Sequence, residues 1–182
     1  YALFSYYDLT VIPLFILMGQ ICFHAGMSAD LFGAGYKWFG RMRGGLAMAT
    51  VAACAGFAAV CGSSPATAVT MGLVALPEMK KYQYDNALAT GSVAAGGTIG
   101  VLIPPSLSFI LYGIMTGQSI GQLFLGGVLP GILQAILFIA TIWVLCTLNP
   151  ALGPGGPGAS LKEKIVSLKN TWIVLFLFVA II

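Results

Sequence analysis

Two long uncharged stretches, each interrupted by helix-breaking residues, constrain this sequence most. Residues 44–77 and 86–160 contain no Asp, Glu, Lys or Arg, yet they hold GSSP at 62–65 and GGTIGVLIPPS at 96–106. A helix needs about 20 apolar residues to cross the hydrocarbon core of a bilayer, which is about 30 Å thick. Both stretches are longer than that. The sequence therefore predicts an all-α membrane protein with helices interrupted inside the bilayer.

Composition excludes a soluble domain and gives no sign of a nucleic-acid partner. The chain is 59% hydrophobic and 7% charged, whereas soluble domains are roughly 45–50% apolar and about 25% charged. The four cysteines lie in apolar segments without metal-site or disulfide-framework spacing, so we interpret them as buried apolar residues. The chain begins at Tyr1 and stops inside an apolar run, so we expect a piece of a longer polypeptide.

The first 43 residues predict two helices of different kinds. Residues 13–27 form an apolar run with Pro13 suited to a first helical turn. Residues 30–43 mix basic and aromatic side chains, a combination typical of a helix in the membrane interface.

Residues 44–79 predict a re-entrant helical hairpin. At 1.5 Å per residue, a helix over 44–61 would extend about 27 Å, whereas one over 67–76 would extend about 15 Å and could not cross. Basic residues flank the unit on both sides, namely Arg41, Arg43, Lys80 and Lys81. The positive-inside tendency places both ends in the cytoplasm, with the tip of the hairpin at residues 62–66.

Residues 84–115 predict a discontinuous helix. Glycines weaken a helix and prolines remove backbone donors, so residues 96–106 should interrupt it before it resumes at 107–115.

The remaining segments complete a return to the cytoplasm. Within 117–149 we expect a turn over 117–130 and then a spanning helix. Residues 150–170 begin with the Gly- and Pro-rich ALGPGGPGAS and end with three lysines, as expected of a flexible cytoplasmic linker. Residues 171–182 start another apolar helix.

The two breaks have the chemistry of a cation site. Non-helical backbone at membrane depth is tolerated only where protein buries it or water reaches it, and helix ends there serve transporters as ion sites. Hydroxyl side chains lie at both breaks, namely Ser63, Ser64, Thr67, Thr98 and Ser106. No carboxylate lies near, which favours sodium over proton coupling.

Three other interpretations compete with this one. Proline kinks and small-residue contacts are also ordinary packing devices. A serine hydrolase using Ser63 or Ser64 would need a base, and the only histidine, His24, lies on a separate predicted helix. A channel or a non-transporting scaffold subunit stays open, because channels also use carbonyl-lined breaks.

Several motifs in fixed order carry a family resemblance. They are PLFILMG at 13–19, GRMRGGLAMATV at 40–51, GSSPATAVTMG at 62–72, PEM at 77–79, GGTIGVLIPPSLSFILYG at 96–113 and SIGQLFLGGVLPG at 119–131. Together they resemble the large membrane subunit, DctM-like, of tripartite ATP-independent periplasmic (TRAP) transporters.

This resemblance implies a secondary transporter of the elevator type, with inverted repeats of which this chain matches the first. It implies sodium-coupled import of organic acid anions, such as dicarboxylates or sialic acid, through the bacterial or archaeal inner membrane. The implied partners are a small membrane subunit and a periplasmic binding protein. Residues 1–43 would belong to the scaffold or arm, and residues 44–115 to the moving part.

The resemblance also implies a sodium site and no further cofactor or enzyme activity. It places Gly62, Ser63, Ser64 and Thr67 at the hairpin tip and Gly97, Thr98, Gly100, Ile103 and Pro104 in the unwound stretch. Most would act through main-chain carbonyls, and Ser63, Ser64 and Thr98 are the side-chain candidates. Ser64, Thr98 and Ser106 would border the substrate cavity. Pro65 departs from the small residue expected there and would stiffen the tip.

Overall fold

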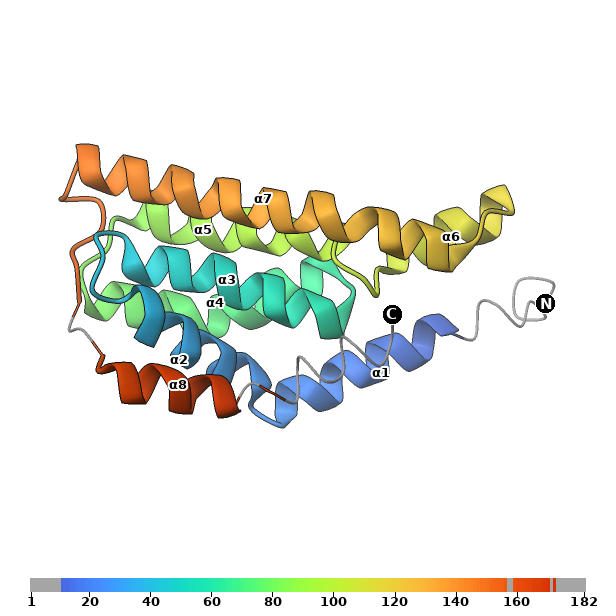
Figure 1. Ribbon diagram of the computed structural model, residues 1–182, viewed down its shortest axis with the longest axis horizontal. Coiled ribbons are helices and arrows are strands. Elements are labelled where there is room, and N and C mark those ends of the chain that lie inside the picture. The colour runs from blue at the N-terminus through green and yellow to red at the C-terminus, as the bar shows by residue number, and fades with distance from the viewer. Residues whose placement is uncertain (1–10, 157–158, 171, 173–182) are drawn as a thin grey trace.

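The computed structural model describes residues 11–156, 159–170 and 172, which form helices and no strand (Figure 1). In chain order the elements are α1 (Val11–His24), α2 (Met27–Phe39), α3 (Gly45–Cys61), α4 (Ser64–Lys81), α5 (Asn86–Thr98), the 3-10 turn η3 (Ile99–Val101), α6 (Leu107–Thr116), α7 (Ile120–Leu148) and α8 (Leu161–Asn170). The all-helical prediction holds for these residues.

Helix α3 is the centre of the molecule. Nearly all of its residues are buried, and α2, α4, α5 and α7 pack around it (Figure 1). Its sequence is rich in Ala, Gly and Cys, and small residues let helix backbones approach closely. A Cβ placed on Gly96 of α5 would lie 2.8 Å from Sγ of Cys54. The small side chains on both helices therefore set how closely α5 approaches α3.

Helices α3 and α4 form a hairpin with a short turn. Gly62 ends α3 in the left-handed conformation, with φ of 63°, and its N–H donates to the Ala58 carbonyl at 2.9 Å. Pro65 lies in the first turn of α4, where its missing N–H costs nothing.

The second arm of the hairpin is longer than the ten residues predicted, so that expectation was wrong. Helix α4 has 18 residues and continues through Pro77 to Lys81. Met79 is fully buried beyond the proline, and its Sδ lies 4.0 Å from Oγ of Ser92. Burial of this last turn offsets the backbone bond that Pro77 cannot make.

The broken helix begins with a side-chain cap and breaks later than predicted. Oδ1 of Asp85 accepts from the amides of Ala87 at 2.9 Å and Leu88 at 3.1 Å. Helix α5 then runs through Gly96 to Thr98, because both glycines at 96 and 97 are held against neighbouring helices. After η3, the chain turns through Pro104 and Pro105, whose peptide bond is cis, and α6 begins.

Helix α7 replaces the turn expected over residues 117–130. It begins at Ile120, has 29 residues and continues through Pro130. A Cβ on Gly131 would lie 2.8 Å from Cγ1 of Ile103, and one on Gly127 would meet the Leu102 carbonyl. This close packing stabilises a helix that its glycines alone would weaken. Within the described residues, α7 alone is long and apolar enough to cross a membrane.

The first two helices begin and end earlier than expected. Gly26, with φ of 80°, separates α1 from α2, and α2 ends at Phe39 before Arg41 and Arg43. Helix α8 packs along α2 (Figure 1), with Nζ of Lys164 5.8 Å from the centre of the Trp38 ring.

The segment after α7 is bound to the helix bundle rather than free, unlike the flexible linker expected from its composition. We call residues 151–156 the strap. Backbone amides of Gly44 and Asp85 donate to the carbonyls of Gly153 at 2.9 Å and Leu152 at 3.0 Å. The amide of Gly156 in turn donates to the carbonyl of Gly40 at 2.7 Å. The strap thus ties together the ends of α2, α3, α5 and α7.

Tyr84 joins the strap to α3. Its buried hydroxyl accepts from the Leu46 amide at 3.1 Å and donates to the Pro154 carbonyl at 2.9 Å. Burial raises the pKa of Tyr84, so the hydroxyl keeps the proton that it donates to the strap.

Replacing Tyr84 with phenylalanine should lower the free energy of unfolding by about 1–3 kcal/mol, because a buried amide and a buried carbonyl would lose their partner. Thermal unfolding of the purified protein measures this. Tyr112→Phe is the matched control, since Tyr112 is 55% exposed. Equal melting temperatures for the two variants would show that the strap is not held through Tyr84.

Candidate functional site

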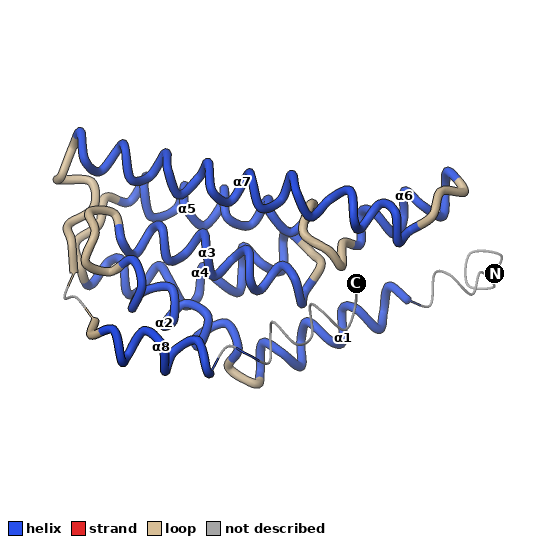
Figure 2. The backbone as a smooth tube through the Cα atoms, viewed as in Figure 1, coloured by secondary structure: helices blue, strands red, loops and turns tan. Residues whose placement is uncertain are grey.

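The hairpin tip and the broken helix meet directly. The amide of Leu107 donates to the carbonyl of Gly62 at 3.1 Å. Gly100 lies against the tip so closely that a Cβ there would be 3.1 Å from the Ser64 nitrogen. Gly97 lies against α4 in the same way, because a Cβ placed on it would be 2.7 Å from Cβ of Ala68. The two breaks, which lie far apart in sequence, therefore form one site at the end of α3 (Figure 2).

Helix ends of both signs meet at this site, since α3 and η3 end here and α4 and α6 begin here. The carboxyl-terminal ends of α3 and of α5 with η3 both lie here, in contact through α3 and η3. The last turn of a helix leaves carbonyls without helical partners and carries partial negative charge. No charged residue occurs in 44–77 or 86–160 to neutralise that charge.

Three hydroxyl oxygens at this contact are buried without a hydrogen-bond partner among the described residues: Ser64 Oγ, Thr67 Oγ1 and Ser106 Oγ. Thr67 and Ser106 are completely inaccessible to solvent. The Thr67 hydroxyl lies close to the thiol of Cys61, which is a weak hydrogen-bond partner. Buried polar atoms are ordinarily hydrogen-bonded, so three orphan oxygens at one contact fit a ligand that supplies the missing interaction.

Ser64 and Thr67 are three residues apart in the first turn of α4, a spacing that puts side chains on one face of a helix. Ser106 is the residue before α6, next to the Leu107 amide that binds the tip. The three hydroxyls therefore come from both sides of the contact between hairpin and broken helix.

The hydroxyls of Ser63 and Thr98 lie elsewhere. Ser63 lines a separate cavity of about 280 Å³ beside Gly19 and Gln20 of α1. Thr98 is exposed, and its hydroxyl donates to the Ala95 carbonyl at 2.6 Å and accepts from Nε2 of Gln134 at 3.2 Å. Of the three predicted side-chain ligands, only Ser64 has a hydroxyl that is buried without a hydrogen-bond partner among the described residues.

The predicted main-chain residues all lie at the contact or beside it. Each of these five residues is buried: Gly62, Gly97, Gly100, Ile103 and Pro104. The amide of Ile103 still donates to the carbonyl of Ile99 at 3.0 Å, so the chain leaves its helical path after this residue.

Gln134 is a residue that the sequence analysis missed. It lies in α7, binds Thr98 through Nε2, and its Oε1 is buried without a partner among the described residues. The available signal was a lone carboxamide in an uncharged apolar run, since such side chains hydrogen-bond across membrane helices.

The hydrolase interpretation finds no support here. Nδ1 of His24 lies 2.8 Å from the Gln20 carbonyl in its own helix, and the side chain is exposed. In the described part of the chain, no group of three or more His, Cys, Asp or Glu side chains could hold a metal ion.

Comparisons with known proteins agree on one family. The model of the family described as "Tripartite ATP-independent periplasmic transporter, DctM component" matches residues 4–182. The C4-dicarboxylate TRAP transporter large permease protein DctM of Pseudomonas aeruginosa is 37% identical over 178 residues, which cover 98% of this chain and 41% of that protein. The protein of the same name from Vibrio cholerae is 36% identical over 178 residues, covering 98% and 39%. The chain thus spans about two fifths of the length of these relatives.

The name of a third relative gives a different substrate. The isethionate TRAP transporter permease protein DctMQ of Oleidesulfovibrio alaskensis is 39% identical over 134 residues, which cover 74% of this chain and 21% of that protein.

Replacing Gly100 with alanine should lower the free energy of unfolding by about 1–3 kcal/mol, because the added methyl would press on the backbone of the hairpin tip. Gly91→Ala in α5 is the control, since a Cβ there meets nothing within 4 Å. In a helix interior that change should stabilise by roughly 0.5–1 kcal/mol. Chemical or thermal unfolding that ranks the two variants the other way would contradict the contact between the two breaks.

Proposed function

This chain belongs to the family of the DctM component of TRAP transporters, and we propose that it forms part of a secondary transporter that imports organic acid anions with sodium. Two observations support this proposal, one from the comparison with known proteins and one from the structure. The family match covers nearly the whole chain, and three orphan hydroxyls surround the contact between two interrupted helices. The orphan hydroxyls carry the coupling-ion part of the proposal.

We assign the sodium site to the contact between the hairpin tip and the broken helix. Ser64, Thr67 and Ser106 would supply hydroxyl oxygens, and main-chain carbonyls at the ends of α3 and η3 would supply the rest. Sodium is a hard cation that oxygen ligands suit, and interrupted helices coordinate sodium in this way in other transporters. Thr98 has a different role in this proposal: it holds α7 against the break through Gln134.

Sodium binding here would fasten the hairpin to the broken helix. The tip and the break are joined by one backbone hydrogen bond, from Leu107 to Gly62, and by the close approach of Gly100. A cation shared by oxygens of both segments adds attraction across the same contact. A substrate cavity bordered by Ser64, Thr98 and Ser106 would then be rigid only when sodium is bound, which raises anion affinity.

The moving unit of the proposed elevator is residues 44–115 together with α7. Helix α7 packs on the break through Gly127 and Gly131, and α3 lies between α4, α5 and α7. Helix α1 would belong to the scaffold, and α2, which packs on α3 and is joined to it by the strap, would be the connecting arm. The α3–α4 hairpin would enter and leave the membrane from the cytoplasmic side, as the flanking basic residues indicate.

The names of two relatives support a substrate class. Their names give C4-dicarboxylate and isethionate, which are small organic anions. We propose such an anion as substrate, delivered by a periplasmic binding protein, and a small membrane subunit as partner. The place of action would be the inner membrane, which the complete transporter crosses many times. A channel or scaffold subunit is the alternative, and it predicts no gradient-driven accumulation.

The full-length transporter in proteoliposomes, with its small subunit and binding protein, should accumulate a radiolabelled organic acid under an imposed sodium gradient. An imposed proton gradient alone should give no accumulation, because no carboxylate or histidine lies at the site. Uptake driven by protons would exclude the sodium site. Non-saturable equilibration that depends on neither gradient would favour the channel.

Thr67→Val and Ser106→Ala should each raise the sodium concentration for half-maximal uptake by about tenfold, equivalent to about 1.4 kcal/mol. Thr67→Val preserves side-chain shape while removing the hydroxyl. Thr50→Val is the control, because Thr50 is equally buried but its hydroxyl donates within α3 to the Leu46 carbonyl at 2.8 Å.

Thr98→Val distinguishes the sequence-based assignment, in which Thr98 is a ligand, from the present one, in which Thr67 and Ser106 are ligands. We expect it to leave the half-maximal sodium concentration unchanged, since the Thr98 hydroxyl is bonded to Ala95 and Gln134. A shift with Thr98→Val, and none with Thr67→Val, would place the ion on the α7 side of the broken helix.

A further inference from the structure

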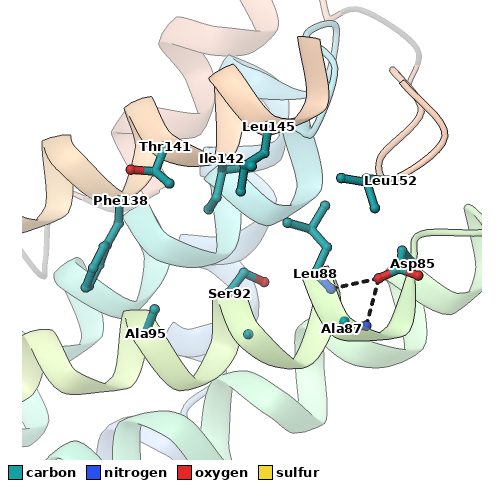
Figure 3. Close-up of a pocket in the computed structure, with 11 residues that line it drawn as sticks. Asp85, Ala87, Leu88, Ser92, Ala95, Phe138, Thr141, Ile142, Leu145 and Leu152 are labelled. Atoms are coloured by element: carbon teal, nitrogen blue, oxygen red, sulfur yellow. Dashed lines mark hydrogen bonds between the residues drawn. The ribbon is translucent and has the colours of Figure 1, made fainter. Parts of the chain in front are cut away.

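A groove lies between α5 and α7, away from the contact of the two breaks. It encloses about 460 Å³. Asp85 and Leu152 lie at one end, and Ala95 and Phe138 lie at the other (Figure 3). Side chains of α5 form one wall and side chains of α7 form the other, so the groove follows the first half of the broken helix.

The lining of the groove offers no free hydrogen-bonding group apart from the carboxylate at its mouth. The Ser92 hydroxyl donates to the Ala89 carbonyl at 2.9 Å, and the Thr141 hydroxyl donates to the Leu137 carbonyl at 2.8 Å. Both are therefore satisfied inside their own helices. The other side chains that line the groove are apolar. An occupant of this space gains from apolar contact and needs no polar partner.

We propose that this groove binds one acyl chain of a membrane phospholipid whose headgroup carries an amine, as in phosphatidylethanolamine. The lining of α7 is continuous with its outer surface, where Leu145 is 44% exposed and Leu137 is 56% exposed. Only 17% of the most apolar window of α7 is buried within the bundle. An acyl chain lying along this surface in the bilayer would therefore reach the groove without crossing a polar rim.

The amine follows from the charge at the mouth. Asp85 is exposed and lines the groove, and its Oδ1 accepts both capping bonds of α5. Its negative charge favours a headgroup ammonium and disfavours a headgroup with net negative charge. Lys80 and Lys81 precede it in the chain, but neither lines the groove. The flanking basic residues also place this end of the bundle at the cytoplasmic surface, where headgroups lie.

Filling the groove has a structural consequence for α5 and α7. Between Asp85 and Ala95, a filled groove supports α5 against α7, whereas at Thr98 the two helices are joined directly through Gln134. A bound acyl chain would therefore act as a spacer that holds the first half of the broken helix in place.

Gly91 provides a variant that fills the groove from within. It lines the groove, and a Cβ placed on it meets nothing within 4 Å. Gly91→Phe should occupy the acyl position with a side chain of this protein. Gly126→Phe is the matched control, since Gly126 of α7 has the same open surroundings and does not line the groove.

Native mass spectrometry of the full-length permease tests the occupant directly. Delipidated protein is titrated with phosphatidylethanolamine or with phosphatidylglycerol of the same acyl chains. We expect the first to bind at least fivefold more tightly to the unmodified protein and to Gly126→Phe, and Gly91→Phe to lose this binding. Equal binding of the amine lipid by Gly91→Phe and Gly126→Phe would overturn the groove as its site.

Asp85→Asn isolates the headgroup. Asparagine also caps helices, so the variant keeps the acceptor while it removes the charge. We expect the preference between the two lipids to fall to less than twofold while acyl binding persists. An unchanged preference would overturn the role of Asp85.

A photolabel applied to the unmodified protein gives a test that needs no variant. Phosphatidylethanolamine with a diazirine in its acyl chain should label peptides that contain residues 88–95 or 138–145 several-fold above those that contain 125–133. Uniform labelling would indicate ordinary lipid contact, and protection of residues 88–95 would indicate that another protein segment fills the groove. Either outcome would overturn the proposal.

Discussion

The rest of this structure depends on how two interruptions of helical backbone satisfy each other. In the proposed membrane placement, each break would expose amides and carbonyls that hydrocarbon cannot solvate, and each unsatisfied group there would cost several kcal/mol. The Leu107 amide meets the Gly62 carbonyl, and Gly100 brings a second piece of backbone against Ser64. The mutual contact of the two breaks therefore requires α3, α4, α5 and α6 to be placed as one unit, and it leaves three hydroxyl oxygens for something other than protein.

Close helix packing makes that contact possible. Helix α3 can be nearly wholly buried because small residues form most of it, and glycines of α5 and α7 meet its neighbours at van der Waals distance. Larger side chains at Gly96, Gly97 or Gly131 would separate the helices and pull the break from the tip. The rigid packing around α3 would also favour a small ligand at the proposed site, because the oxygens cannot move far to reach a different one.

The sequence predicted the parts of this arrangement that depend on local backbone chemistry. Gly62 and Pro65 mark the turn of the hairpin, and Pro104 and Pro105 mark the interruption of the second helix, since these residues restrict the backbone wherever they occur. The length of α4, the start of α7 and the docking of the strap were not predictable in this way. They depend on tertiary burial of Met79, Gly127 and Gly153, which overrides local propensity. The directions of Ser63 and Thr98 needed the neighbouring helices, because residue type says nothing about which side of a helix faces a site.

The contacts at the two ends of the bundle differ in kind, and this difference affects which end can open. At the breaks, few backbone contacts join the two segments and several oxygens have unused bonding capacity, so an ion shared across them, as proposed, would change how firmly they are joined. At the opposite end, the strap binds α2, α3 and α5 through several backbone hydrogen bonds and through Tyr84, none of which depends on a ligand. If the ion binds at the breaks as proposed, the contacts there would be the first to open when it leaves. Local opening follows the free energy of the contacts that must be lost, so the hairpin tip is where a bound ligand has the greatest leverage over the conformation of the whole unit.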